Sequence, residues 1–471
     1  MSKRSQNIQL CILFILGTIL WQLPAPEGLT VHGWHLLIIF MMTIIGVILG
    51  PVPMSVTALL GGLTCVLTKT LTLNELLGGF SSSIIWIVVL AFFIARCLIK
   101  TGLGRRVAYF FISKIGHTTI GLSYGLICTE FLLSPMIPSV TARGGGIIYP
   151  VARSIIDAYG AGNTQAAIRR TGAFIIQICF HAATITSAMF VTAMAGNPLA
   201  VNLASTMGVE ITWATWALGA IVPGLVSLLV LPLVVFMVCP PDIRSHEESP
   251  QLARRALAEM GPLSRNEIYM LLIFVLLLFC WIMDAKIGLD ATTSALIGVV
   301  SLLLAGVLTW DDAISEKSAW DTMVWFAILL TMSGFLGKLG VMQWLGTQIQ
   351  DLLGEDHSPT VVIAAILGIY IYIHYFFASI TAHITVFFVV FSGLLVSLGG
   401  MQPLPAAIML AYASSLSGSL THYGNSVAPI FYGAKYLTTM EWWKVGFVVC
   451  TVNVIIWIVF GYLWWSLLGW I

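Results

Sequence analysis

The chain has 471 residues, of which 59% are hydrophobic and only 9% are charged. A water-soluble globular protein of this length needs more polar side chains to cover its surface, so the composition excludes that class. It predicts an integral membrane protein whose surroundings are the lipid bilayer. The net charge of +1 gives no sign of a nucleic-acid partner, and we expect none.

Apolar segments long enough to cross a bilayer recur from one end of the chain to the other. A spanning helix needs roughly 20 apolar residues, and some of the segments are interrupted by helix breakers. Their approximate positions are 6–23, 35–49, 53–69, 83–101, 165–192, 212–238, 267–284, 290–309, 320–336, 360–377, 403–420 and 441–469. The fold class that follows is an all-α polytopic membrane protein with about 11–12 transmembrane helices.

The beginning of the chain predicts a retained helix. Residues 1–34 place Lys3 and Arg4 before a short apolar run, but the small-residue cleavage site of a signal peptide is not obvious. No Ser- and Arg-rich leader of the plastid type precedes this run, so we expect a bacterial inner (plasma) membrane protein.

Basic residues gather around one later connection, which the positive-inside rule places in the cytoplasm. They are Arg96, Lys100, Arg105, Arg106 and Lys114. The eight cysteines, in contrast, are scattered singly and form no C-x-x-C pair. This pattern indicates neither a disulfide framework nor a metal site, and we expect no metal ion and no cofactor.

One long polar stretch, residues 241–266, follows paired prolines and divides the chain nearly in half. Its mixed charges predict an amphipathic linker on the cytoplasmic side. The parts on either side of it, residues 35–240 and 267–471, resemble each other in three places that occur in the same order. This self-similarity indicates an internal duplication.

The three matches have similar offsets. SSIIWIVVLAFFIARCLIKTGLG at 82–104 matches DTMVWFAILLTMSGFLGKLG at 321–340, with the tryptophans 239 residues apart. PSVTAR matches ASITAH at an offset of 240, which places Arg143 opposite His383. MFVTAMAGNPLA matches SLTHYGNSVAPI, where the two Gly-Asn pairs are 228 residues apart.

Each half interrupts an apolar segment with glycine or proline at a matching place, which is typical of the binding site of a secondary transporter. Backbone groups freed from a helix survive at membrane depth only where they line a cavity or are buried in protein. The N-terminus of a half-helix suits an anion, and the hydroxyls of the two sequences SVT and SIT add neutral donors. Both halves therefore present the same anion-binding tip.

Arg143 leaves two interpretations open. A cationic side chain near the bilayer centre costs at least ~2.5 kcal/mol on insertion scales, so it needs a partner. A dicarboxylate would supply one, because a guanidinium suits a carboxylate, and His383 can carry a positive charge depending on pH. Alternatively, Arg143 is neutralised by Glu130 or snorkels from the end of a hairpin.

Other residues in the same regions also allow two interpretations. Gly144, Gly145 and Gly146 either belong to the site or permit close helix packing. The Gly-Asn pairs either unwind a helix or form ordinary turns. Glu130, His181 and His374 lie in apolar surroundings, where each relays protons or is hydrogen-bonded for structural reasons.

The order of these motifs resembles the divalent anion/sodium symporter (DASS) family. It comprises a GFSS-x-x-x-W start at 79–86, a TGLGRR turn at 101–106, PSVTARGGG, the SITAH copy and LTHYGNS near the end. From about residue 35 to 471 the chain is most similar to the branch of bacterial citrate, tartrate or malate exchangers and plastid 2-oxoglutarate/malate translocators.

The resemblance implies an inverted-repeat fold with a scaffold domain and a transport domain that moves like an elevator, in a homodimer. It implies re-entrant hairpins near 124–157 and 365–398, each with an S-x-T tip, and broken helices near 170–200 and 405–435. Together with the duplication, it makes the following residues candidate substrate contacts: Ser139, Val140, Thr141, Arg143, Gly196, Asn197, Ser379, Ile380, Thr381, His383, Thr421, Gly424 and Asn425.

The middle residues of the two tips depart from the sodium-coupled members, which resemble this chain but carry asparagine there. Val140 and Ile380 take these positions, and neither side chain can help to bind sodium. We therefore expect a sodium-independent antiporter of di- and tricarboxylates such as malate, succinate, fumarate and 2-oxoglutarate, with Arg143 and His383 as fixed positive charges in place of sodium. 

Two other functions are compatible with parts of this pattern. A sodium- or proton-coupled dicarboxylate symporter is the nearer alternative. The other is an intramembrane enzyme, but the sequence contains neither a G-x-x-x-x-G-K-[ST] phosphate loop nor an H-E-x-x-H metal site. We expect a transporter and not an enzyme.

Overall fold

The computed structural model describes residues 3–159, 163–245, 248–341, 343–344, 347–348 and 358–471. Within this part of the chain the regular elements are helices, and nine of them are long and apolar enough to cross a membrane. The prediction of an all-α polytopic membrane protein is confirmed. Residues 1–2 of the expected N-terminal region and 246–247 of the expected linker lie outside the described residues.

The elements of the first half follow the predicted segments closely. They are α1 (Lys3–Trp21), α2 (Val31–Leu49), α3 (Met54–Leu67), α4 (Leu73–Gly78), η1 (Gly79–Ser81), α5 (Ser83–Thr101), α6 (Leu103–Ile115), α7 (Thr119–Leu133), the π-helix η2 (Thr141–Ile148), α8 (Tyr149–Ala158), α9 (Gln165–Met189), η3 (Val191–Ala193), α10 (Gly196–Thr206) and α11 (Trp213–Val238).

The second half begins after the polar stretch, which itself contains a helix. The elements are α12 (Glu248–Glu259), α13 (Arg265–Ile282), α14 (Asp284–Ile287), α15 (Ala291–Leu304), α16 (Trp310–Ser315), α17 (Lys317–Lys338), α19 (Pro359–Tyr372), η4 (Ile373–Phe376), α20 (Ile380–Ser397), α21 (Pro403–Ser417), α22 (Ala428–Tyr432) and α23 (Thr439–Leu467).

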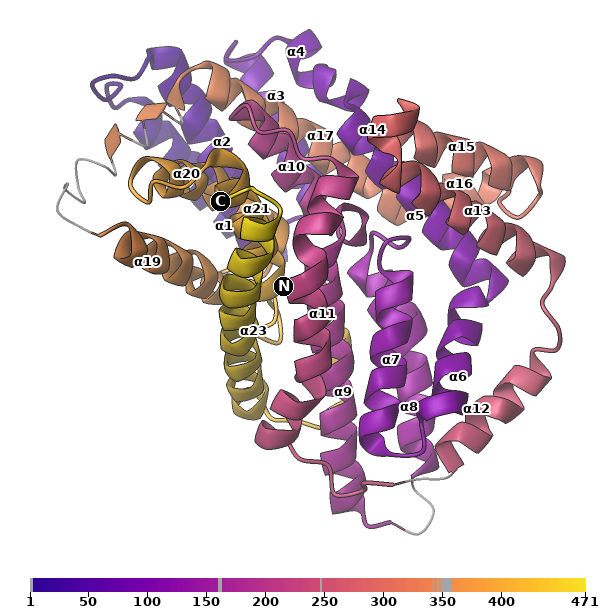
Figure 1. Ribbon diagram of the computed structural model, residues 1–471. Coiled ribbons are helices and arrows are strands. Elements are labelled where there is room, and N and C mark those ends of the chain that lie inside the picture. The colour runs from indigo at the N-terminus through magenta and orange to yellow at the C-terminus, as the bar shows by residue number, and fades with distance from the viewer. Residues whose placement is uncertain (1–2, 160–162, 246–247, 342, 345–346, 349–357) are drawn as a thin grey trace.

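The helices pack in two groups, and each group draws on both halves of the chain. In one group, α17 packs against α2, α3 and α5, while α15 packs against α5 and α13. In the other group, α9 packs against α7, α11 and α21, and α23 packs against α11. Figure 1 shows α7, α9, α11 and α23 running roughly alongside one another in the lower part of the view, with α3, α5, α15 and α17 in the upper part.

Two tryptophans of α23 donate to carbonyls of α11, one of which a proline leaves without its helical partner. Pro223 lies inside α11, and a proline within a helix removes the hydrogen bond to the carbonyl four residues earlier. That carbonyl, on Gly219, accepts a hydrogen bond of 2.9 Å from Trp465 Nε1, and the adjacent carbonyl of Leu218 accepts one of 2.6 Å from Trp464 Nε1. Because lipid offers no replacement partner, these indoles allow α11 to keep its proline at membrane depth.

An ion pair joins the end of α5 to the start of α16. Lys100 Nζ lies 2.5 Å from Asp312 Oδ2, and Asp312 also accepts from the backbone N–H and hydroxyl of Thr309 in a capping box. The hydrogen bond from Lys100, followed by those from Thr309, lowers the pKa of Asp312 to about 2. This carboxylate therefore stays ionised at neutral pH and links the two halves.

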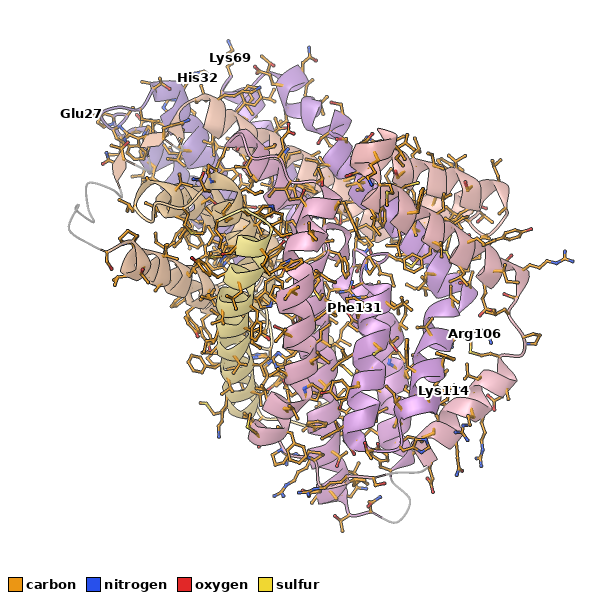
Figure 2. All side chains as sticks on the ribbon, in the orientation of Figure 1. Glu27, His32, Lys69, Arg106, Lys114 and Phe131 are labelled. Atoms are coloured by element: carbon orange, nitrogen blue, oxygen red, sulfur yellow. The ribbon has the colours of Figure 1, made fainter. Side chains whose placement is uncertain are left out.

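Arg106 holds the turn between α12 and α13 against α6. Its Nε and Nη2 lie 2.5 and 3.2 Å from the two carboxylate oxygens of Glu267, and its Nη1 donates to the carbonyl of Gly261 at 2.8 Å. Gly261 has a φ of +64°, which glycine adopts without strain. Arg106 and Lys114 lie beside α6 and α12, away from the end of the molecule that carries Glu27, His32 and Lys69 (Figure 2).

Replacing Arg106 by alanine is expected to lower the free energy of unfolding by about 3 kcal/mol, because the substitution leaves a largely buried carboxylate without its counter-charge. The Glu267 side chain is only 3% exposed. Thermal unfolding in detergent measures the loss. Arg105→Ala is the matched control, since Arg105 is the exposed neighbour in the same helix, and equal losses in both variants would contradict the assigned role of Arg106.

Candidate functional site

Two helical hairpins carry the S-x-T sequences, and their tips have the same local structure. Hairpin 1 (residues 119–158) comprises α7, η2 and α8, and hairpin 2 (residues 359–397) comprises α19, η4 and α20. The Ser139 hydroxyl accepts from the backbone N–H three residues on at 3.1 Å, and the Ser379 hydroxyl does the same at 3.3 Å. Both serines thus act as N-caps, as side-chain oxygens do at helix starts.

Hydroxyl and apolar residues of the tips face different surroundings. Ser139, Thr141, Ser379 and Thr381 are partly exposed. Val140 and Ile380 are only 5% and 6% exposed, and Ile380 packs on the backbone at Gly418. At each helix start the middle residue thus turns inward while its two neighbours turn outward, and the role of Val140 and Ile380 as substrate contacts stays a prediction. 

Two interrupted helices follow the hairpins. Break 1 (residues 190–195) separates α9 from α10, and break 2 (residues 418–427) separates α21 from α22. Asn197 Nδ2 donates to the carbonyl of Phe190 at 2.9 Å, and Asn425 Nδ2 donates to the carbonyl of Gly418 at 3.1 Å. Each asparagine thus reaches back seven residues to close its break, so the Gly-Asn pairs mark unwound helices in both halves.

The remaining atoms of the two asparagines are used differently. Asn197 donates a second hydrogen bond of 2.6 Å to the carbonyl of Ser187, while its Oδ1 accepts from Ser415 at 3.2 Å. Asn425 Oδ1 accepts from the backbone N–H groups of Val427 and Ala428, each at 3.0 Å. Asn197 is fully buried and Asn425 nearly so, so both act here through the backbone of the breaks.

The other candidates in break 2 are also buried. Gly424 lies against the Thr421 hydroxyl and the His374 ring, where a side chain at this position would come within 3.0 to 3.3 Å of both. The Thr421 hydroxyl is buried and has no hydrogen-bond partner among the described residues. At the start of α10, directly after break 1, Gly196 leaves room for the hairpin 2 side chains of Ile384 and Thr381.

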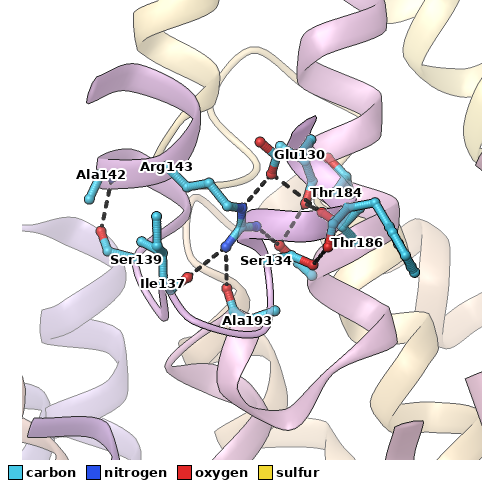
Figure 3. Close-up of polar contacts among 12 residues, drawn as sticks. Glu130, Ser134, Ile137, Ser139, Ala142, Arg143, Thr184, Thr186 and Ala193 are labelled. Carbon is cyan, nitrogen blue, oxygen red and sulfur yellow. Dashed lines mark hydrogen bonds and ion pairs between the residues drawn. The ribbon is translucent and has the colours of Figure 1, made fainter. Parts of the chain in front are cut away.

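Arg143 is fully buried and engages the first half of the chain (Figure 3). Its Nε pairs with the carboxylate of Glu130. Its Nη1 donates to the carbonyl of Ile137 at 2.6 Å and to that of Ala193 at 3.0 Å, while Nη2 donates to the Ser187 hydroxyl at 3.2 Å. The guanidinium therefore ties hairpin 1 to break 1.

The contacts of Arg143 favour one of the two interpretations left open by the sequence. Glu130 on α7 supplies the counter-charge, and its Oε1 also accepts from Thr186 at 3.3 Å. The second carboxylate oxygen is buried without a partner among the described residues. In this conformation, Arg143 is thus neutralised by Glu130 and does not face an open surface.

A pair of imidazoles takes the corresponding place in the second half. His374 Nε2 lies 2.7 Å from the carbonyl of Gly424, and His374 Nδ1 lies 3.2 Å from His383 Nδ1. Since only an N–H can bond the carbonyl, the neutral His374 ring accepts at Nδ1 and His383 donates there. The imidazole pair ties hairpin 2 to break 2, and the His383 Nε2 atom remains without a partner among the described residues.

Each hairpin tip also reaches the break of the opposite half. Thr141 Oγ1 donates to Ser426 Oγ at 2.8 Å, so the tip of hairpin 1 meets break 2. Thr381 Oγ1 lies 3.7 Å from the position that a Cβ of Gly196 would occupy, so the tip of hairpin 2 meets the end of break 1. The S-x-T hydroxyls and the Gly-Asn pairs predicted from the sequence are therefore brought together, in a crossed arrangement.

Sequence reasoning did not assign roles to several residues of this region. Tyr370 precedes His383 by 13 residues, as Glu130 precedes Arg143, and its ring meets the His383 ring edge-on with centroids 4.4 Å apart. Applying the offset of 240 to Glu130 identifies Tyr370 directly. Ser187, by contrast, has no such signal, and Ser426 is marked only by its place after the second Gly-Asn pair.

The sequence is similar to those of known membrane transporters along nearly its whole length. The family model described as the sodium:sulfate symporter transmembrane region matches residues 4–471. The chain is 45% identical to dicarboxylate transporter 1, chloroplastic, of Arabidopsis thaliana, over 96% of this chain and 82% of that protein. It is 34% identical to the inner membrane protein YbhI of Escherichia coli, over 98% of each.

Among solved structures, the fold is similar to that of the YdaH transporter from Alcanivorax borkumensis, with a TM-score of 0.56 over 84% of this chain and 88% of that chain. The sequences are 13% identical, so this similarity concerns the fold alone. The family match and the identities above settle the membership: the chain belongs to the sodium:sulfate symporter family, also called the divalent anion/sodium symporter family, and is a multi-pass membrane transporter and not an enzyme.

Proposed function

We propose that this protein exchanges di- and tricarboxylates across a bacterial inner membrane without sodium. The substrate class is supported by the name of the Arabidopsis relative, a dicarboxylate transporter, and by two tips that each present hydroxyl donors at a helix start. Substrates of the malate, succinate, fumarate and 2-oxoglutarate type carry two carboxylates, one for each tip.

Sodium independence is supported by one observation: side-chain N–H groups bond the backbone carbonyl oxygens that lie between each hairpin and its break. Carbonyl oxygens of Ile137 and Ala193 converge on one point in the first half, and oxygen atoms are the ligands that hard cations use. Here the N–H groups of Arg143 fill that point. In the second half, His374 Nε2 donates to the carbonyl of Gly424, and His383 in turn donates to His374 Nδ1. These contacts support the proposal that fixed side chains do here what sodium does in sodium-coupled transporters.

The substrate would be bound by the outward-facing hydroxyls. Ser139, Thr141, Ser379 and Thr381 are partly exposed, and both tips begin a helical arm, whose N-terminal end favours negative charge. In this conformation Glu130 balances Arg143 and the His374 ring is neutral, so the helix ends and the hydroxyl donors would attract the dianion. Carrying the polar hydroxyls of the tips across the bilayer interior would be costly when no substrate pairs with them. A bound dianion pairs them, so we propose that only loaded sites cross, which makes transport an exchange.

The movement itself is part of the proposal. The group of α7, α9, α11, α21 and α23, with α20 packed on α21, would move as a unit against the group of α2, α3, α5, α13, α15 and α17, like an elevator, within a homodimer. The division of the helices into two packed groups supports such a movement. It is compatible with rigid-body transitions between two packings.

Counterflow in liposomes tests this function. Purified protein should take up labelled malate only when the vesicles are preloaded with an unlabelled dicarboxylate, at equal rates in sodium and in potassium buffers. Sodium-dependent uptake into empty vesicles would instead identify a symporter. Uptake into empty vesicles that follows a pH gradient would identify proton coupling, with His383, His374 or Glu130 as the titrating group.

A further inference from the structure

We propose that Ser426 is a specificity-determining residue, whose hydroxyl recognises a hydroxyl or oxo group on carbon 2 of the dicarboxylate. Substrates that carry this group would then be preferred over unsubstituted ones such as succinate. The inference rests on the proposed function, because it names which member of the substrate class the site selects.

The two S-x-T tips, which are alike, suit the two carboxylates that all these substrates share. Each tip offers a serine N-cap and a partly exposed threonine at equivalent positions. The two serine hydroxyls accept from the backbone in the same way and can each donate a proton, so they suit two chemically equivalent carboxylates. A substituent on carbon 2 destroys the equivalence of the two ends, so only a feature that differs between the halves can recognise it.

Ser426 is such a feature. The Gly-Asn pair of the first half is followed by Pro198, and that of the second half by Ser426 at the same offset of 228. Proline has no side-chain hydrogen-bonding group, whereas the Ser426 hydroxyl both donates and accepts. Ser426 is exposed, and its oxygen lies 2.8 Å from Thr141 Oγ1 at the tip of hairpin 1.

The Thr141 contact leaves the Ser426 proton available. Thr141 donates to Ser426 Oγ, which satisfies one lone pair and holds the serine side chain beside the tip. The Ser426 O–H can then donate to an oxygen that lies next to the carboxylate bound at that tip. In a 2-hydroxy or 2-oxo acid, this oxygen is on the carbon adjacent to the carboxylate, so it lies within reach of the neighbouring hydroxyl.

The other polar differences between the halves are less suited to this task. Arg143 and Glu130 are buried and paired with each other, and His383 is buried among aromatic rings. His422 replaces Met194, but its Nδ1 accepts from Trp443 Nε1 at 3.1 Å and its ring lies against that of Tyr432. Ser426 combines exposure with a direct bond to an S-x-T tip.

The test compares substrate preference in Ser426→Ala and Ser426→Thr reconstituted in preloaded liposomes. Unlabelled malate and succinate compete with labelled succinate, and the ratio of their half-inhibitory concentrations is measured. In the unmodified protein malate should compete better. A neutral hydrogen bond corresponds to roughly a fivefold difference, so Ser426→Ala should lower the preference by roughly fivefold while succinate exchange persists. Ser426→Thr keeps a hydroxyl and should keep the preference.

Each other outcome has a defined meaning. An unmodified protein that prefers succinate, an unchanged ratio in Ser426→Ala, or a parallel loss for both substrates would overturn the role of Ser426. Ser426→Gly, a second variant without the hydroxyl, must give the same ratio as Ser426→Ala, and both must match the melting temperature of the unmodified protein. Absence of any counterflow in the unmodified protein would refute the proposed function itself, so the two failures are distinguishable.

Discussion

Arg143→Ala is expected to abolish exchange and to lower the free energy of unfolding by about 3–5 kcal/mol, the cost of breaking a buried ion pair from one side. The substitution leaves the Glu130 carboxylate buried without a counter-charge. It also removes the donors that join hairpin 1 to the carbonyls of Ile137 and Ala193. The tip that carries Ser139 and Thr141 would then lose its attachment to break 1.

A double-mutant cycle separates stability from transport. Glu130→Leu combined with Arg143→Met removes both charges and should recover most of the stability, but not exchange, because the link to break 1 stays broken. Thermal unfolding and counterflow are measured on all four proteins. If Arg143→Ala exchanges normally, the guanidinium has no part in transport.

Glu130→Gln tests whether the charge of Arg143 ever acts on the substrate. It keeps the shape of the side chain and removes the balancing charge. Tighter binding of a dianion by this variant would show that the guanidinium and the substrate interact, as the first interpretation of the sequence holds. Unchanged binding would leave Arg143 as a positioning residue for hairpin 1.

The two asparagines of the breaks are expected to respond unequally to the same substitution. Asn197→Asp replaces an amide that donates to two buried carbonyls, so it places a carboxylate oxygen against carbonyl oxygens and leaves both acceptors unpaired. A loss of stability of about 2–4 kcal/mol is expected, from one to two buried polar groups left without partners, together with loss of exchange.

Asn425→Asp is the matched comparison. Asn425 uses its oxygen to accept from two backbone N–H groups and its nitrogen for one carbonyl. An aspartate keeps the two acceptor contacts, and hydrogen bonds from N–H groups to a carboxylate are stronger than those to an amide. Its melting temperature should fall less than that of Asn197→Asp. Equal losses, or the reverse order, would contradict the hydrogen-bond assignment of the two breaks.

Composition and periodicity predicted much of the fold because a bilayer restricts what a chain can do. Apolar segments form helices there, and where glycine or asparagine interrupts a helix, the freed backbone N–H and C=O groups need hydrogen-bond partners within the protein. The hairpin tips and the breaks were therefore visible as S-x-T and Gly-Asn motifs in matching places. The contact of each hairpin tip with the break of the opposite half could not be predicted. An offset between repeats shows which residues are equivalent, but it does not show which residues of the two repeats are in contact.

The orientation of single side chains was the harder part. The sequence showed that Arg143 needs a partner, and both Glu130 and a bound anion satisfied that need equally well. Only the packing of α7 beside η2 brings the carboxylate to the guanidinium. The burial of Val140 and Ile380 was not visible for a related reason: a motif names three adjacent residues, but each helix start turns the middle one toward the core.

The crossed contacts between tips and breaks have a consequence for how the two copies diverged after duplication. Thr141 of the first copy bonds Ser426 of the second, and Thr381 of the second lies near Gly196 of the first. A substitution at either end of such a contact alters the surroundings of a residue more than 180 positions away in the chain. Each repeat therefore limits which substitutions the other can accept at these contacts, so the two repeats are expected to have changed together at these positions.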